Sequence, residues 1–384
     1  FNGCKGLISV TIPSNVISIG NYAFSNCKSL EELTIPEGVK KLGTKIIADT
    51  YIEKIKIPST VTYSEQEYHG ESGTLAGDTV LTEVEFAEGM TQIPQYICSG
   101  ASSVERFVIP STVTSIGYKA FYKCTSLDKI ALPENLTKIA SYAFDGCASL
   151  INVSIPKAVT TIGSYSFQSC TSLESVVIEA NSKKGFETVI GESAFNGCNG
   201  LISVTIPGNV ISIENYAFSN CKSLEELTIP EGVKKLGAKI IADTYIEKIK
   251  IPSTVTYSDH ESYSDFGALA GDAVLTEVQF TEGMTQIPQY ICSGASSVER
   301  ILIPSTVTSI GYEAFYKCTS LDRIALPEKL TVIGSRAFSE CTSLIDVAIP
   351  KAVTTIGSYS FQSCTSLESV VIEANSKKGF ETVI

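Results

Sequence analysis

The amino-acid sequence predicts a β-rich repeat solenoid, and two observations carry this prediction. A motif of about 23 residues recurs sixteen times along the 384 residues. These repeats form a larger duplication, because residues 195–384 match residues 1–190 at a constant offset of 194 with no gap. Repeats that contact only their neighbours stack into one solenoid, however long the chain. We therefore expect repeats 1–8 in residues 1–194 and repeats 9–16 in residues 195–384, the last of them truncated, as one continuous solenoid.

Each repeat begins with a segment that is typical of a short strand. The first repeat has the pattern F-x-x-C-x-x-L-x-x-I-x-I-P, in which Leu7, Val10 and Ile12 alternate with polar residues before Pro13. Alternation with a period of two indicates a strand with one buried face. Proline ends the strand, because it offers no N–H to a ladder. Parallel strands stacked one per coil follow from this pattern.

The second half of each repeat predicts another short extended segment and a closing turn. Val16 and Ile19 form an apolar pair, and Gly20 follows them. We expect the glycine to form a tight turn with left-handed backbone, although Ala140 and Glu214 stand at its place in two repeats. Ala23 and Phe24 are expected to close the coil and pack inward.

Three repeats in each copy depart from the pattern. The third contains a polar, acidic insertion, Tyr63–Thr74 and its counterpart Tyr257–Ala268, which is the least similar part of the two copies. The fourth, from Leu75, lacks the cysteine, the proline and the glycine. The eighth replaces the proline with Glu179. Loops on one face of a solenoid are frequent sites of function, although neutral drift in exposed loops explains them equally well.

The twelve cysteines follow the repeat, which favours buried free thiols. Ten occupy the fourth place of a repeat, as Cys4 does, whereas Cys98 and Cys292 take the first place, where phenylalanine usually stands. Neighbouring rungs about 4.8 Å apart would place them in one column, where cysteine acts as a small hydrophobe. Disulfides between adjacent rungs are the geometric alternative. Zinc is disfavoured, because the sequence has no C-x-x-C and no histidine beside the column.

Composition excludes several classes of function. The net charge of −12 argues against nucleic acid and anionic lipid as partners. No run of 18 apolar residues occurs, so this chain has no predicted membrane span. Phe1 opens inside the repeat pattern and Ile384 ends inside a repeat, so we expect a fragment of a longer chain, with any signal or anchor outside it.

No catalytic or cofactor site is predicted. The two histidines, His69 and His260, both lie in the insertions but at places that do not correspond. The acidic residues of the insertions offer oxygen ligands for calcium, but their spacing matches no calcium loop, and solvated loops are favoured. These residues are Glu65, Glu67 and Glu71 in the first copy and Asp259, Glu261 and Asp265 in the second.

The outward residues of the predicted strands are the main candidates for binding a protein. On adjacent rungs Glu32 is expected to face Lys54, and Glu83 to face Arg106. Mutual neutralisation is the structural interpretation, and a mixed-charge concave face is the functional one. The candidates on the strands are Glu32, Lys54, Glu83, Arg106, Lys129, Glu226, Lys248, Glu277, Arg300 and Arg323. The candidates in the insertions are Tyr68, His69, Tyr263 and Phe266.

Tyrosines around the Ala-Phe turn are a further candidate surface. Tyr22, Tyr118 and Tyr142 are examples. Tyrosine is a good interface residue, but packing of the ring along the solenoid with a solvated hydroxyl explains the column more simply. The absence of tryptophan disfavours a sugar-stacking platform.

The full repeat, F-x-x-C-x-x-L-x-x-I-x-I-P-x-x-V-x-x-I-G-x-x-A-F, resembles the BspA-like, Treponema-type leucine-rich repeat over essentially the whole chain. Unlike the general leucine-rich consensus, it has no asparagine ladder after the strand, where Asn15, Gly38 and Thr60 stand in turn. The resemblance implies a curved, right-handed solenoid from a bacterial surface or secreted protein. It also implies adhesion or binding to a protein of a host or neighbouring cell.

We therefore expect a non-enzymatic, monomeric protein-binding module without cofactor or metal. Its predicted partner is a host or bacterial surface protein. Duplication would present two similar faces to a dense target and raise avidity. The alternatives are a structural stalk that presents another domain and, less favoured, a glycan- or calcium-dependent binding module.

Overall fold

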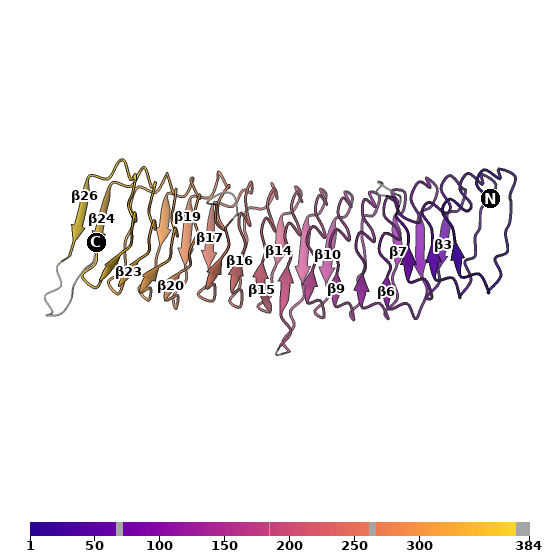
Figure 1. Ribbon diagram of the computed structural model, residues 1–384, viewed down its shortest axis with the longest axis horizontal. Helices are drawn as coiled ribbons and strands as arrows, with labels where there is room; N and C mark the ends of the chain where they lie inside the picture. The colour runs from indigo at the N-terminus through magenta and orange to yellow at the C-terminus, as the bar shows by residue number, and fades with distance from the viewer. Residues whose placement is uncertain (67–71, 184, 261–265, 374–384) are drawn as a thin grey trace. The chain divides into compact units, whose positions relative to one another are not determined.

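The structure is a computed structural model that describes residues 1–66, 72–183, 185–260 and 266–373. In these residues the chain is a parallel β-solenoid of about 15 turns that contains strands and turns but no helix (Figure 1). The predicted fold class is confirmed. The chain divides into two compact units, Phe1–Leu201 and Ile202–Ile384. Their boundary lies close to the start of the second copy at Phe195, and a single continuous solenoid stays a prediction.

The longer strands form where the sequence alternates before the proline. In the first unit these strands are β3 (Lys54–Ile57), β5 (Glu83–Phe86), β7 (Arg106–Val108), β10 (Asn152–Ile155) and β12 (Ser175–Ile178). In the second unit they are β14 (Ser203–Thr205), β17 (Lys248–Ile251), β19 (Glu277–Phe280), β21 (Arg300–Leu302), β24 (Asp346–Ile349) and β26 (Ser369–Ile372). Alternate residues of β3 are exposed and buried, as the period of two predicts.

The second apolar pair of each repeat forms a shorter strand. In the first unit these strands are β1 (Ser18–Ile19), β2 (Lys41–Leu42), β4 (Tyr63–Ser64), β6 (Gln92–Ile93), β8 (Ser115–Ile116), β9 (Lys138–Ile139), β11 (Thr161–Ile162) and β13 (Thr188–Ile190). In the second unit they are β15 (Val210–Ile213), β16 (Lys235–Leu236), β18 (Tyr257–Ser258), β20 (Gln286–Ile287), β22 (Ser309–Ile310), β23 (Val332–Ile333) and β25 (Thr355–Ile356).

Each strand pairs in parallel with the equivalent strand of a neighbouring coil. Lys54 lies opposite Glu83, and Ile55 lies opposite Val84. In the first unit the long strands form the sheets β3-β5-β7 and β10-β12, and the short strands form β1-β2-β4 and β6-β8-β9-β11-β13. In the second unit the corresponding orders are β17-β19-β21, β24-β26, β15-β16-β18 and β20-β22-β23-β25.

The core of each unit contains a column of stacked phenylalanine rings. Phe121, Phe144 and Phe167 are fully buried, and their ring centroids lie 5.1 Å apart at each step. Phe315 and Phe338 continue the same arrangement in the second unit at 5.2 Å. Offset stacking adds to the burial energy of each ring. The predicted inward packing of the Ala-Phe pair is confirmed.

The turn that closes each coil contains left-handed residues, but the predicted glycine is not one of them. Tyr22 and Asn26 have φ angles of 55° and 57°, and the equivalent residues of most coils share this conformation. Gly163 lies outside the left-handed region, and a Cβ there would lie 2.6 Å from the carbonyl carbon of Ala140. The expectation of a left-handed glycine was therefore wrong. Glycine stands there because the backbone of the preceding coil passes so close.

The cysteine column consists of free thiols that bond to the backbone. All twelve cysteines are free, and only Cys4 is classed as exposed. The Cys147 thiol donates to the Phe121 carbonyl over 3.1 Å, and the Cys341 thiol donates to the Phe315 carbonyl over the same distance. These two thiols thus satisfy a carbonyl of the preceding coil, as do those of Cys124 and Cys318. The structure confirms free, mostly buried thiols.

One rung of the column in each unit holds a buried aspartate in place of the cysteine. Asp78 takes the cysteine place of the fourth coil and is 1% exposed. Its Oδ2 accepts hydrogen bonds from the backbone and hydroxyl of Thr50, at 3.0 and 2.8 Å. Its Oδ1 accepts from the backbone of Val80 and Leu81. Asp272 and Thr244 repeat the arrangement in the second unit.

We expect the thiols to resist alkylation in the native protein. Burial raises the pKa of the Cys124 and Cys318 thiols well above the ordinary value, and the thiolate is the reactive form. Iodoacetamide at pH 8 should modify Cys4 within minutes and leave Cys124 and Cys318 unmodified until the chain unfolds. Mass spectrometry after brief labelling measures this. Rapid native labelling of Cys124 would contradict the burial of the column.

The same thiols should make stability fall at alkaline pH. The folded chain keeps Cys124 and Cys318 protonated, whereas the unfolded chain releases those protons above the ordinary value of 9.0. A group whose pKa is higher in the folded chain than in the unfolded chain stabilises the fold fully at pH values below its unfolded pKa. This stabilisation is lost as the pH rises. Denaturation midpoints should therefore decrease above pH 9. Cysteine-to-alanine variants at these two places should show a shallower decrease.

Candidate functional site

The strand face comprises the outward residues of the long strands and of the equivalent segments in other coils. Glu83 lies between two cations, with its Oε2 3.7 Å from Lys54 Nζ and 3.5 Å from Arg106 Nη1. Glu277 lies between Lys248 and Arg300 in the second unit, at 3.9 and 3.5 Å. The cations are about two-thirds exposed, so each pair contributes at most about 1 kcal/mol. The predicted pairing of Glu83 with Arg106 is confirmed.

The predicted pairing of Glu32 with Lys54 does not form. Among the described residues no ion pair joins them, and Lys54 pairs with Glu83 instead. Residues 30–36 are not a strand, so Glu32 is not held opposite Lys54 in a ladder. Glu226 and Lys248 show the same separation in the second unit. The prediction failed because the strand pattern alone does not guarantee pairing.

The other predicted strand candidates lie farther along the face. Lys129 forms an isolated bridge with Asn152, and Arg323 forms one with Asp346. No salt bridge joins Arg323 to Asp346 in the described structure. In the described structure, Lys129 and Arg323 therefore lack the ion pairs that neutralise the charges around Glu83 and Glu277.

A second outward column differs between the two copies. Lys56 pairs with Glu85 across β3 and β5. In the second copy Lys250 lies opposite Gln279, which carries no charge. The substitution leaves Lys250 without the ion pair that its counterpart has. In this column the lysine therefore forms an ion pair in the first copy and lies opposite an uncharged residue in the second.

An acidic column beside the strand face was missed by the sequence analysis. It consists of the residue that follows the apolar seventh place in ten of the repeats, and its members are exposed: Glu31, Glu53, Glu105, Asp128, Glu174, Glu225, Glu247, Glu299, Asp322 and Glu368. In the described structure none of them takes part in a salt bridge. Reading the repeat one place earlier than the strand candidates would have revealed this column.

The strand face of the second unit is hollowed where the predicted candidates come together. A depression of about 950 Å³ spans the outer surfaces of residues 225–231, β17 and β19. Glu226, Lys248 and Glu277 line it together with Glu225 and Glu247. An adjoining depression of about 710 Å³ shares Glu225 and Glu226. Three of the predicted candidates thus share one surface.

Apolar side chains border the same depression. Tyr245 lines both hollows and is 57% exposed, and Ile202 lines the adjoining one and is 61% exposed. Exposed aromatic residues are enriched at protein interfaces. The surface therefore combines acidic, basic and apolar groups within a few coils.

The structure describes only some of the candidate residues in the insertions. Tyr68, His69 and Tyr263 lie outside the described residues. Phe266 is described, and the Lys239 ammonium lies 4.4 Å from the centre of its ring. His260 stacks on Tyr290 at 4.2 Å, which is a packing role.

The described acidic residues of the insertions are engaged by lysines. Glu65 lies 2.6 Å from Lys41, and Asp259 lies 3.6 Å from Lys235. Hydrogen bonding and charge from Glu65 raise the pKa of Lys41. No group of His, Cys, Asp and Glu suited to a metal ion occurs among the described residues. Calcium binding by the insertions stays a prediction.

The tyrosines of the turn pack on one another along the first unit. Tyr118 contacts Tyr142 at 5.7 Å between centroids, and Tyr142 stacks on Tyr165 at 4.7 Å. The Lys119 ammonium lies over the Tyr142 ring at 5.4 Å. The Tyr165 hydroxyl donates to Glu192, and burial together with this bond raises the pKa of Tyr165 to about 12. These contacts agree with the structural interpretation of the column.

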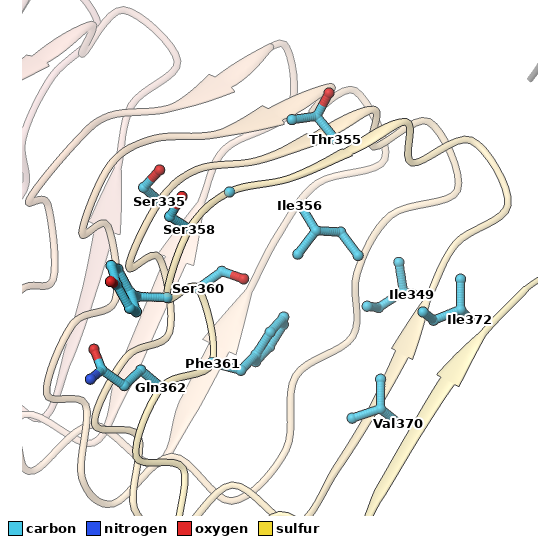
Figure 2. Close-up of a pocket in the computed structure, with 12 residues that line it drawn as sticks. Ser335, Ile349, Thr355, Ile356, Ser358, Ser360, Phe361, Gln362, Val370 and Ile372 are labelled. Carbon is cyan, nitrogen blue, oxygen red and sulfur yellow. The ribbon is translucent and has the colours of Figure 1, made fainter. Parts of the chain in front are cut away.

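A further pocket of about 680 Å³ lies at the last described coils, and apolar residues from core positions form part of its lining (Figure 2). Ile349, Phe361 and Ile372 line it. In the first copy Phe167, the counterpart of Phe361, is fully buried, as are the counterparts of the other two. The pocket is therefore a part of the core that the described residues leave open, and we assign no ligand to it.

The described part of the chain contains no helix with the length and hydropathy of a membrane span. A family model for the BspA type leucine rich repeat region matches residues 1–99, 91–186, 188–271 and 265–381. The chain belongs to the BspA-type leucine-rich repeat family. Proteins of this bacterial repeat family are generally non-enzymatic binding modules. No curated protein matches the chain.

Solved structures of bacterial leucine-rich repeat proteins resemble this BspA-type chain. A protein from Bacteroides ovatus is 28% identical, covers 83% of this chain and 86% of its own, and has a TM-score of 0.55. A leucine rich cell surface protein from Faecalibacterium prausnitzii is 22% identical, with coverage of 96% and 92% and a TM-score of 0.39. A protein from Eubacterium ventriosum is 23% identical, with coverage of 85% and 94% and a TM-score of 0.44. The last two likenesses concern the fold alone.

Proposed function

We propose that this BspA-type chain is a cell-surface module that binds a protein of a host or neighbouring cell through its strand face. The observation that carries the proposal is the hollow in the second unit, where charged and apolar groups meet on one surface. Glu226, Lys248 and Glu277 line it, and Tyr245 stands exposed at its edge. A mixed surface of this kind suits a protein partner better than a nucleic acid or an anionic lipid.

The rigid coil supports this role. The backbone of each long strand is anchored by buried residues such as Ile249 and Val278, so the outward side chains keep a fixed spacing. Preorganised side chains lose less conformational freedom on binding. Corresponding residues in the first copy offer a second, similar face, which favours avidity for a dense target.

A charge-reversal experiment tests the proposal. The test variant carries Lys54→Glu, Arg106→Glu, Lys248→Glu and Arg300→Glu. The control variant carries the same number of reversals off the strand face, at Lys40, Lys138, Lys183 and Lys329. Binding of the purified chain to matrix proteins and to intact bacterial cells is measured by biolayer interferometry and pull-down.

We expect the strand-face variant to bind a recognised protein at least tenfold more weakly, and the control to stay within twofold of the original chain. Equal binding by all three chains would contradict the strand-face proposal. Absence of binding by the original chain to every protein and cell would favour the structural stalk.

A further inference from the structure

The two copies differ at one point of the hollow on the strand face of the second unit. Most residues that line this hollow are identical to their counterparts in the first copy. Only two of them differ: Gln279 stands where the first copy has Glu85, and Thr281 stands where it has Ala87. Gln279 lies opposite Lys250 in the ladder of β17 and β19, so the difference is concentrated around this lysine.

The lysine at this point is the same in both copies, but its neighbour is not. Lys56 lies opposite Glu85 across β3 and β5, and the two side chains form an ion pair. Lys250 lies opposite Gln279 in the same register. In the part of the chain that the structure describes, Lys250 forms no ion pair. The same ammonium group is therefore neutralised in the first copy and available in the second.

Gln279 also supplies donors where Glu85 offers only acceptors. A glutamine amide carries two N–H donors, whereas an ionised glutamate can only accept. Thr228 lines the hollow with Lys250, and both stand two residues before the proline of their repeats, in adjacent coils. The hydroxyl of Thr228 is a further donor. The hollow of the second unit thus combines a cation with neutral donors that suit a carboxylate.

The carboxylates of the hollow leave this point accessible to an anion. Glu277 already lies between two cations, and Glu231 accepts hydrogen bonds from two hydroxyl groups. The other carboxylates stand two or three places earlier in the repeat than Lys250, which corresponds to about 7–10 Å along the strand direction. They are Glu225, Glu226 and Glu247. Physiological salt, with a Debye length of about 8 Å, screens much of their repulsion at that distance.

We propose that Lys250 and Gln279 determine the specificity of the hollow by binding the carboxylate of an aspartate or glutamate of the partner protein. The Lys250 ammonium and the Gln279 amide donate to its oxygens. In the first copy the same carboxylate would meet Glu85 and would have to break the ion pair of Lys56. The second copy is therefore the preferred one of two similar faces. This inference rests on the proposed function and names the chemistry of the partner at one position.

Two reciprocal substitutions test the inference on the full chain. Gln279→Glu gives the second copy the residue of the first, and Glu85→Gln gives the first copy the residue of the second. Both keep the size of the side chain and change its charge and its donors. The matched control is Thr281→Ala, which introduces the other residue that distinguishes the first copy.

The probe is a decapeptide of alternating Glu and Val, and the control probe alternates Gln and Val. NMR of the chain with 15N-labelled lysine follows the side-chain signals of Lys56 and Lys250 during the titration. The variants Lys56→Arg and Lys250→Arg assign the two signals. The affinity at each lysine is thus measured separately, whatever the peptide does elsewhere on the surface.

We expect the Glu-Val peptide to bind at Lys250 at least threefold more tightly than at Lys56, because an exposed ion pair changes an equilibrium constant by up to about fivefold. Glu85→Gln should raise the affinity at Lys56 to that at Lys250. Gln279→Glu should lower the affinity at Lys250 to that at Lys56, and Thr281→Ala should leave it within about twofold. The Gln-Val peptide should move neither signal.

Three outcomes would overturn the inference. The first is equal affinity at Lys56 and Lys250 in the original chain. The second is a Lys250 signal that does not respond to the Glu-Val peptide up to millimolar concentration. The third is a Lys250 affinity that Gln279→Glu leaves unchanged or that Thr281→Ala lowers by more than Gln279→Glu does.

The two proposals fail separately. If charge reversal of the strand face weakens binding of a surface protein but Lys56 and Lys250 respond equally to the peptide, the proposed function stands and this inference is wrong. If charge reversal has no effect on protein binding and Lys250 still binds the peptide more tightly than Lys56, the strand-face proposal is wrong and the carboxylate site stands.

Discussion

The substitution Asp272→Ala is expected to lower the free energy of unfolding by about 4 kcal/mol. The Asp272 carboxylate is buried and accepts four hydrogen bonds, two of them from Thr244 and the others from the backbone of Val274 and Leu275. Removing it leaves buried donors without acceptors, at a cost of about 1–3 kcal/mol each, and the costs are not additive. Guanidinium denaturation followed by circular dichroism measures the change.

The variant Thr244→Val is the matched control. It removes the hydroxyl donor and keeps the volume of the side chain, so the carboxylate retains three backbone partners. We expect a loss of about 1 kcal/mol. A smaller loss for Asp272→Ala than for Thr244→Val would contradict the central role of the carboxylate. The pair Asp78 and Thr50 allows the same comparison in the first unit.

The substitution Gly163→Ala is expected to destabilise the chain by about 2–3 kcal/mol. An added Cβ would lie 2.6 Å from the backbone of Ala140 and Ser141 and 2.8 Å from the carbonyl oxygen of Ile139. These atoms belong to the backbone and cannot rotate away, so the two coils must separate. Overpacking of this kind costs about 1–3 kcal/mol. The denaturation midpoint of the variant measures the loss.

The variant Gly20→Ala provides the comparison. A Cβ at Gly20 meets no atom within 4 Å, and its backbone lies outside the left-handed region. Alanine there should leave stability unchanged or raise it slightly, because it restricts the unfolded chain. If both variants lose the same free energy, close approach of the coils is not the reason for glycine at Gly163.

Much of the fold could be predicted from the repeat pattern, because every coil repeats the same order of buried and exposed residues. The alternation around Ile55 and Ile57 predicted a strand, and the strand forms with those residues buried. The phenylalanine column followed from one aromatic residue per repeat. The thiol column followed from the fixed place of cysteine, and even the aspartate at Asp78 occupies that same place.

The turn and the glycine were less predictable, because sequence does not show how closely two coils approach. Tyr22 adopts a left-handed backbone although tyrosine has no preference for it. The hydrogen bonds from neighbouring coils, such as that from the Tyr22 amide to the Thr44 carbonyl, hold this conformation. Repeated inter-coil bonding thus decides the backbone there, against local propensity.

The candidate site was predicted in part. The charges of Glu83 and Glu277 pair as adjacent rungs predicted, and Glu226 lies with Lys248 in one hollow. The absence of backbone hydrogen bonds between residues 225–230 and β17 was not predicted, because the apolar pattern of the repeat does not show which neighbouring segments pair.

The hydrogen bonding of the strand face also bears on how the second unit comes apart. In a repeat protein, stability is approximately a sum of coil terms and of couplings between neighbouring coils. On the strand face of the second unit, the described residues 225–230 form no backbone hydrogen bond with residues 202–206 or with residues 247–252, and residues 299–304 form none with residues 322–327. Cooperativity should therefore be weakest at these junctions. Under mechanical load or mild denaturant, the unit is expected to divide there, into segments that unfold in separate steps.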